Sequence, residues 1–195
     1  MSFVPANFVF AHKLAVFGFP NCAEFGILES NFHEPWARNY SSSLETRINY
    51  SPSDCFETFP FPPDPASIES IGERYHAHRR DIMAARREGL TATYNRFHSP
   101  HEVSNDIAGL RALHVEMDHA VAAAYGWTDL ELGHGFHQTK QGIRYTISEA
   151  VRRTVLDRLL ALNHERYAAE QSAASAAPRP KAKVRKRARD RAGLF

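Results

Sequence analysis

The sequence predicts an α+β fold that is mostly α: a short mixed α/β region, a small three-helix antiparallel bundle and a disordered basic tail. Most strand-like runs lie in the first 63 residues, and three capped helical patterns follow them with almost no strand signal. The last segment is rich in Ala, Ser, Pro, Lys and Arg, and it contains too little apolar surface to order itself. We place the three parts at residues 1–63, 64–171 and 172–195.

The first part begins with two short apolar runs, Phe8–Ala11 and Leu14–Phe17, which are typical of strands. From Ala23 to Arg38 apolar residues recur every three or four positions, which predicts one helix. Its buried face would comprise Phe25, Leu28, Phe32 and Trp36, with its last turn kinked or shortened by Pro35. A further strand is predicted over Leu44–Tyr50, ending in a turn at residues 51–54.

Residues Thr46–Pro63 connect the two folded parts, and we call them the aromatic connector. Phe56, Phe59 and Phe61 surround three prolines, which exclude a helix interior and favour extended backbone. Leaving three phenylalanines exposed would forfeit about 1.5–3 kcal/mol of burial each. We therefore predict an extended connector whose rings, Phe59 and Phe61 above all, are anchored between the two parts.

Each helix of the second part has its own start signal. Asp64-Pro65 combines an N-cap with a proline at the first helical position, and Ser99–Glu102 and Thr146–Glu149 are capping boxes. Gly89 and Gly126 are predicted to end the first two helices. The buried stripe of the second helix is predicted to contain Ile107, Leu110, Leu113, Met117, Val121 and Ala124.

Between the second and third helices, Trp127–Tyr145 predicts an irregular loop with one short strand near Arg144. His134 and His137 in this loop, with Asp118 and the histidines of the preceding helix, are the best metal-ligand candidates. Their spacing matches no zinc pattern. Hydrogen-bonding histidines are the favoured interpretation, and no metal is predicted; the helical histidines concerned are His114 and His119.

Composition and charge set limits on the class of protein. Between residues 178 and 195 there are eight Lys/Arg and one Asp, a charge of +7, which leaves 16 basic and 21 acidic residues, a charge of −5, in the rest. No apolar run is long enough for a membrane span, and the N-terminus lacks signal-peptide features. Cys22 and Cys55 form neither a disulfide framework nor a metal spacing. We expect a cytoplasmic protein with no membrane contact.

Several basic and aromatic positions are candidates for contact with nucleic acid. Lys140–Arg144 places two cations and an amide on a glycine-containing loop, a pattern suited to phosphate contact. Tyr94–His98 could stack on bases, although an aromatic corner between helices is the favoured interpretation. The tail could bind polyanions or serve only for solubility. The candidate DNA-binding residues are Arg47, Arg96, Lys140, Arg144, Lys181, Lys183, Arg185, Lys186, Arg187, Arg189 and Arg191.

Motifs for catalysis are absent from the sequence. It has no glycine-rich loop between a strand and a helix for a nucleotide or S-adenosylmethionine, no Gly-x-Ser-x-Gly turn and no Cys/His nucleophile pairing. We therefore predict no catalytic, cofactor-binding or metal residues in this chain.

The aromatic connector and the residues just before it resemble a known protein family. SSLETR at 42–47, leading into YSPSDCFETFPFP at 50–62, resembles the end of the target-recognition region of large class I adenine-N6 DNA methyltransferases, the MmeI-like restriction–modification enzymes and related phage-defence systems. Upstream, FGILES at 25–30 and FHEPWA at 32–37 resemble a helix that precedes this connector in the family.

Downstream, three further segments resemble the family's C-terminal helical region. They are GLT at 89–91, TYNRFH at 93–98 and paired positions between Leu113 and Trp127. The resemblance covers roughly residues 8–170. It implies that residues 1–63 are the remnant of a mixed α/β recognition domain. The family's S-adenosylmethionine loop and Asn-Pro-Pro-Tyr/Phe motif lie upstream of the matching region and are not in this chain, so no catalytic residue is carried over.

The resemblance implies a C-terminal, DNA-associated and non-catalytic portion of such an enzyme. The intact enzyme would transfer methyl from S-adenosylmethionine to adenine N6 after flipping the base from the duplex. The expected partners are DNA and a methyltransferase portion encoded upstream, and the chain itself would hold no cofactor. The alternative is a protein-interaction subunit, or an inert remnant of a truncated gene, with no DNA role.

Overall fold

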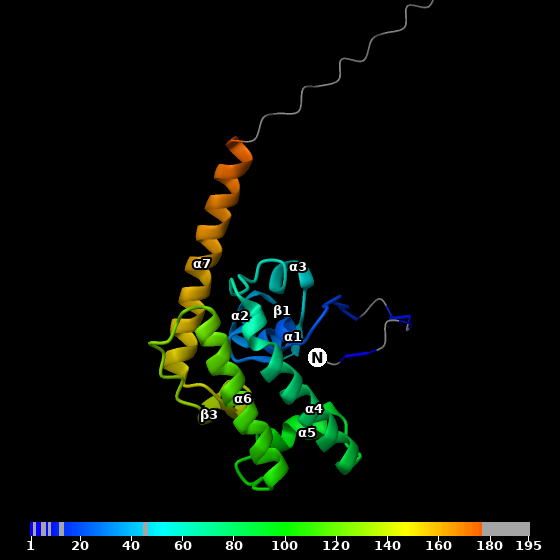
Figure 1. The fold of residues 1–195 in the computed structure, drawn as a ribbon. Helices are drawn as coiled ribbons and strands as arrows, with labels where there is room; N and C mark the ends of the chain where they lie inside the picture. The colour runs from blue at the N-terminus through cyan, green and yellow to red at the C-terminus, as the bar shows by residue number, and fades with distance from the viewer. Residues whose placement is uncertain (2, 5–6, 8, 12–13, 45–46, 177–195) are drawn as a thin grey trace, which may run out of the picture.

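The computed structural model describes residues 1, 3–4, 7, 9–11, 14–44 and 47–176 (Figure 1). This part of the chain is mostly helical and carries two small antiparallel sheets, which confirms the α+β, mostly α prediction. In chain order the elements are α1 (Ala23–Glu29), α2 (His33–Tyr40), β1 (Ser42–Leu44), β2 (Arg47–Asn49), α3 (Pro52–Cys55), the 3-10 helix η1 (Pro65–Ile68), α4 (Glu69–Arg86), α5 (Leu90–Phe97), α6 (Asn105–Ala124), β3 (Gly135–Thr139), β4 (Gly142–Thr146) and α7 (Glu149–Ala176).

The centre of the fold is the packing of α1 against α4 and α6. A Cβ added at Gly72 would lie 2.3 Å from the carbonyl oxygen of Cys22, so only glycine allows α4 to approach the start of α1 this closely. One continuous core therefore spans residue 63. The three-helix bundle predicted for the second part is wrong in its membership, because α1 packs with α4 and α6 while α7 packs against α2.

The single helix predicted from Ala23 to Arg38 is two helices, α1 and α2, separated by an extended Ser30. In a continuous helix the ring of Pro35 would clash with the carbonyl group four residues earlier, whereas in α2 it lies in the first turn, where it is tolerated. The predicted apolar face is confirmed even so, since all four of its members are buried: Phe25, Leu28, Phe32 and Trp36.

The strand predictions in the first part were wrong in detail. The described residues of Phe8–Ala11 and Leu14–Phe17 form no strand, and the two sheets in the described part of the chain are made by other segments. The strand expected over Leu44–Tyr50 is instead a short antiparallel pair, in which Ser43 of β1 lies opposite Ile48 of β2.

The start signals of the second part are partly confirmed. The Asp64 side chain accepts a hydrogen bond from the Ala66 amide at 3.3 Å, as predicted for an N-cap. The last helix, α7, begins at Glu149, so its cap is Ser148, whose Oγ accepts from Val151 N at 3.4 Å, and not Thr146 of the predicted capping box. The capping box predicted at Ser99–Glu102 is wrong: Ser99 lies in a turn, and α6 begins only after Ser104. The helix-ending residue after α4 is Arg87, in a left-handed conformation (φ 53°), rather than Gly89.

Three further differences follow from local sequence. Gly89 precedes an unpredicted helix, α5. The loop expected over Trp127–Tyr145 contains the hairpin β3–β4, whose turn is completed by Gly142 at a φ of 90°. Residues 172–176, assigned to the disordered tail, are the end of α7, where alanine favours helix, and in Figure 1 this end projects away from the core. The remainder of the predicted tail lies outside the described residues.

Candidate nucleic-acid interface

The aromatic connector ties the first part of the chain to α6 and α7. Phe59 is 4% exposed, and its ring stands edge-on to His33 and Trp36, with centroids 4.7 and 6.0 Å away. Tyr125 Oη donates to the Pro60 carbonyl at 3.0 Å, and Asn163 Nδ2 donates to the Thr58 carbonyl at 2.7 Å. The prediction of a buried Phe59 anchor is confirmed.

Two details of the connector differ from the prediction. Phe61 is only partly buried and packs on the core beside Phe59. The segment is also not extended throughout, because Pro52–Cys55 forms α3. Proline in the first turn of a short helix loses no hydrogen bond, which explains why the Ser-Pro pair starts a helix here.

A buried carboxylate, Asp118 of α6, joins three separate segments. It is 0% exposed and accepts hydrogen bonds from Asn31 N at 2.8 Å, Asn31 Nδ2 at 2.7 Å and His134 Nε2 at 2.7 Å. Thr146 Oγ1, at the end of β4, donates to Asn31 Oδ1 at 2.7 Å. This network, which we call the Asp118 hub, holds the β3–β4 hairpin against the α1–α2 junction.

Three of the four histidines weighed as metal ligands take part in hydrogen bonds, and the first of them, His114, pairs through Nε2 with Asn31 Nδ2 at 3.0 Å. His134 bonds to Asp118, and His137 Nε2 donates to the Gly133 carbonyl at 2.9 Å. Burial lowers the pKa of His114, which favours its neutral form beside Asp118. Within the described residues, no group of three or more His, Cys, Asp or Glu side chains is arranged to hold a metal ion.

The β3–β4 hairpin presents the two cations expected to contact DNA. Lys140 is exposed in the turn, and Arg144 lies on β4 opposite His137. Arg144 Nη1 donates to the Ile143 carbonyl at 3.1 Å. Among the residues that the structure describes, no carboxylate forms an ion pair with Lys140 or Arg144, so both charges are available to an anion.

Arg111 of α6 holds this hairpin in place, a role that sequence reasoning missed. Its guanidinium donates to four backbone carbonyls of the α5–α6 connection, those of Arg96, Phe97, Ser99 and Glu102. The same group lies 5.0 and 5.6 Å from the ring centroids of Phe136 and Tyr145 on the hairpin. An arginine within an amphipathic helix gives no sequence signal for such a clamp.

The other residues predicted to contact DNA are either engaged within the fold or lie outside the described part of the chain. Arg96 is neutralised by two carboxylates, Glu88 at 2.7 Å and Glu102 at 2.8 Å, and is therefore not free for a phosphate. Tyr94 donates to Glu29 at 2.8 Å and packs beside Phe97, as the aromatic-corner interpretation predicts. The Arg47 side chain and the seven predicted tail cations lie outside the described part: Lys181, Lys183, Arg185, Lys186, Arg187, Arg189 and Arg191.

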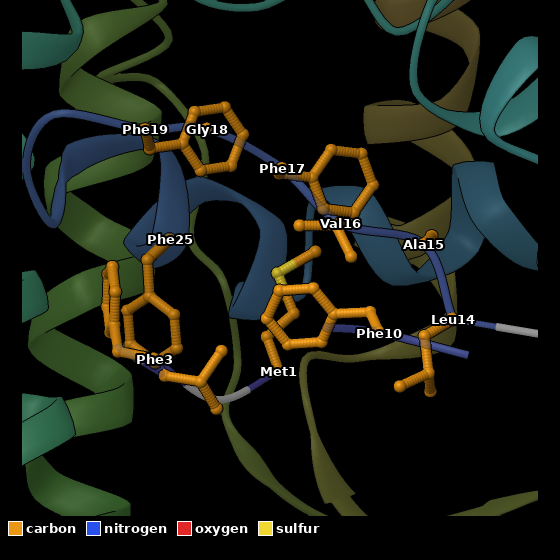
Figure 2. Close-up of a pocket in the computed structure, with 11 residues that line it drawn as sticks. Met1, Phe3, Phe10, Leu14, Ala15, Val16, Phe17, Gly18, Phe19 and Phe25 are labelled. Carbon is orange, nitrogen blue, oxygen red and sulfur yellow. The ribbon is translucent and has the colours of Figure 1, made fainter. Parts of the chain in front are cut away.

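An apolar cavity of about 560 Å³ lies beneath the N-terminal segment, over α1. Figure 2 shows the rings of Phe10 and Phe17 facing this space, with Phe3 and Phe25 at one side. Val9, Leu14 and Val16 nearby are 99%, 60% and 57% exposed. The cavity offers contact area but no group for chemistry; its lining is Met1, Phe3, Val4, Phe10, Leu14, Ala15, Val16, Phe17, Gly18, Phe19 and Phe25.

Membrane insertion finds no support in the helices. None of those in the described ranges combines the length and the apolar composition that crossing a bilayer requires.

Comparison with known proteins gives one match. Residues 1–63 match the family model of the MmeI target recognition domain, so the match covers α1, α2, the β1–β2 pair and the connector. No curated protein and no solved structure matches the chain. The N-terminal third of this protein is therefore similar to the MmeI target recognition domain.

Proposed function

We propose that this chain is the C-terminal, DNA-associated and non-catalytic portion of a site-specific adenine-N6 DNA methyltransferase of a restriction–modification or phage-defence system. The match of residues 1–63 to the MmeI target recognition domain carries the proposal. The helical part would brace this region, since α1 packs against α4 and α6 and the Asp118 hub fixes the hairpin to the α1–α2 junction. Methyl transfer itself would belong to a partner polypeptide encoded upstream.

If a partner polypeptide carries out methyl transfer, this chain should lack that activity. The isolated chain should neither bind S-adenosylmethionine nor methylate DNA, because its sequence contains neither a glycine-rich cofactor loop nor an Asn-Pro-Pro-Tyr/Phe motif. Isothermal titration with S-adenosylmethionine at micromolar concentration, and a labelled-methyl transfer assay on duplex DNA, measure the two activities. A saturable heat of cofactor binding would contradict this assignment.

Sequence recognition is tested by selection from a pool of random duplexes. The full-length protein is expected to enrich a short shared sequence at salt concentrations that suppress non-specific contacts. Recovery of an unenriched pool at every salt concentration would count against a target-recognition role.

A second candidate function is a protein-interaction subunit without a DNA role. The exposed Val9, Leu14 and Val16 beside the N-terminal cavity favour it, because clustered exposed apolar side chains mark interaction surfaces. The two candidates differ in one readout: only the first predicts duplex affinity that survives removal of the basic tail.

A further inference from the structure

We propose that Arg38, Arg144 and Arg152 form one phosphate-binding surface across α2, β4 and α7. The inference rests on the proposed DNA role and states which face of the folded part meets the duplex backbone. Only Arg144 was a sequence-level candidate. The other two arginines are 114 positions apart, and the fold brings them to the same carboxylate.

The first observation is that Glu34 is shared by two arginines. Its Oε2 accepts from Arg152 Nη2 at 2.7 Å, and its Oε1 accepts from Arg38 Nε one helical turn away. Two guanidinium groups thus face one carboxylate, which leaves an excess charge of +1. Glu34 and Arg38 are about one-third exposed, so this excess is accessible to solvent.

The second observation places Arg144 near this pair. Arg144 and Thr146 are two positions apart on β4 and therefore share one face of the hairpin, and Thr146 is bonded to Asn31 just before α2. His98 lies beside β4, because its Nδ1 accepts from the Tyr145 amide at 3.2 Å. Burial and then the charges of Arg144, His114, Arg111 and Arg38 lower the pKa of His98 to about 4.

The third observation is the contrast with other described arginines. Arg74, Arg86 and Arg158 each face one carboxylate, those of Glu116, Asp106 and Asp129, so their charges cancel pairwise. The chain before residue 178 carries a net charge of −5, which repels phosphate in general. Arg38, Arg144 and Arg152 with Glu34 give a local excess of +2 on this acidic background.

The chemistry of the surface suits a duplex backbone. Guanidinium groups bind phosphate oxygens in a bidentate manner, and such contacts fix the register of a protein on DNA without reading bases. Arg38 lies inside the matched recognition region, whereas Arg144 and Arg152 lie outside it. The surface would therefore position the recognition region on the duplex.

The test measures how salt changes the affinity of the full-length protein for a duplex. Fluorescence anisotropy of a labelled duplex of mixed sequence reports the binding. Arg38→Gln with Arg144→Gln should weaken binding by roughly tenfold at about 0.1 M salt and reduce the slope of log K against log salt by about 1–2, since each phosphate contact contributes about 0.9. The matched control, Arg74→Gln with Arg80→Gln on α4, removes the same charge and should change the slope by less than about 0.5.

Glu34→Gln provides a result that misfolding cannot imitate. It removes the carboxylate shared by Arg38 and Arg152, so it should strengthen duplex binding. If wild type binds but the two double variants behave alike and Glu34→Gln gives no gain, the surface is refuted while the DNA role stands. If wild type shows no duplex binding, the DNA role fails and the surface with it.

Discussion

We expect Phe59→Ala to lower the free energy of unfolding by about 3–5 kcal/mol, the usual cost of truncating a buried aromatic ring. Phe59 is 4% exposed and contacts His33, Trp36 and Phe61, so its removal leaves a cavity between α2 and the connector. Tyr125 and Asn163 donate to backbone carbonyls on either side of Phe59, and these hydrogen bonds would not fill the cavity.

Urea denaturation followed by far-UV circular dichroism measures the change. Tyr167→Ala is the matched control, because Tyr167 is an aromatic residue on α7 that is 62% exposed. It should stay within about 0.5 kcal/mol of wild type, as surface changes do. A Phe59→Ala variant within the same range would mean that the connector is a free linker.

Asp118→Ala should be as damaging, with an expected loss of about 3–5 kcal/mol. The substitution leaves the Asn31 amide, the Asn31 side chain and the His134 ring with buried donors and no acceptor. Asp106→Ala is the control: it removes an aspartate on the same helix whose side chain is 34% exposed. Equal destabilisation by the two changes would contradict the hub.

The hub also predicts a pH dependence. Burial disfavours the charge of Asp118, but its electrostatic interactions with His114 and His134 and the hydrogen bonds from His134 and Asn31 outweigh it, so the pKa of Asp118 is lowered. A carboxylate with a lowered folded pKa stabilises fully above the unfolded value, about 3.9, and loses this as pH falls through the folded value. Below about pH 4, the free energy of unfolding should therefore fall less steeply with decreasing pH for Asp118→Ala than for wild type. Urea denaturation at a series of pH values measures this slope.

Helical periodicity was the part of the sequence that predicted the structure best. The predicted stripe of α6 is confirmed by Ile107, Leu110, Met117 and Val121, all 0% exposed, because a 3.6-residue repeat directly reports which face is buried. The face of α1 and α2 was found although the break at Ser30 was missed. Of the hairpin β3–β4, the strand near Arg144 was predicted, whereas β3 was missed because it contains glycine, histidine and glutamine and its pairing depends on tertiary contacts.

The candidate site was less accessible to sequence reasoning. Lys140 and Arg144 could be singled out because they lie close together in one segment. The pairing of Arg96 with Glu88 and Glu102, which removes it as a candidate, depends on how α5 folds back. The convergence of Arg38 and Arg152 on Glu34 depends on the packing of α2 against α7, which no local pattern encodes.

The central claim is that the folded part, and not only its basic tail, contacts DNA. A salt titration of duplex binding with three proteins tests it: full length, a chain ending at Ala177, and that chain with Lys140→Ala and Arg144→Ala. The shortened chain retains every helix and strand of the described structure. Deleting the tail, with its charge of +7, should remove most of the salt-dependent affinity. A weaker binding should survive, and the double substitution should reduce it further; complete loss of binding on tail deletion would contradict the account.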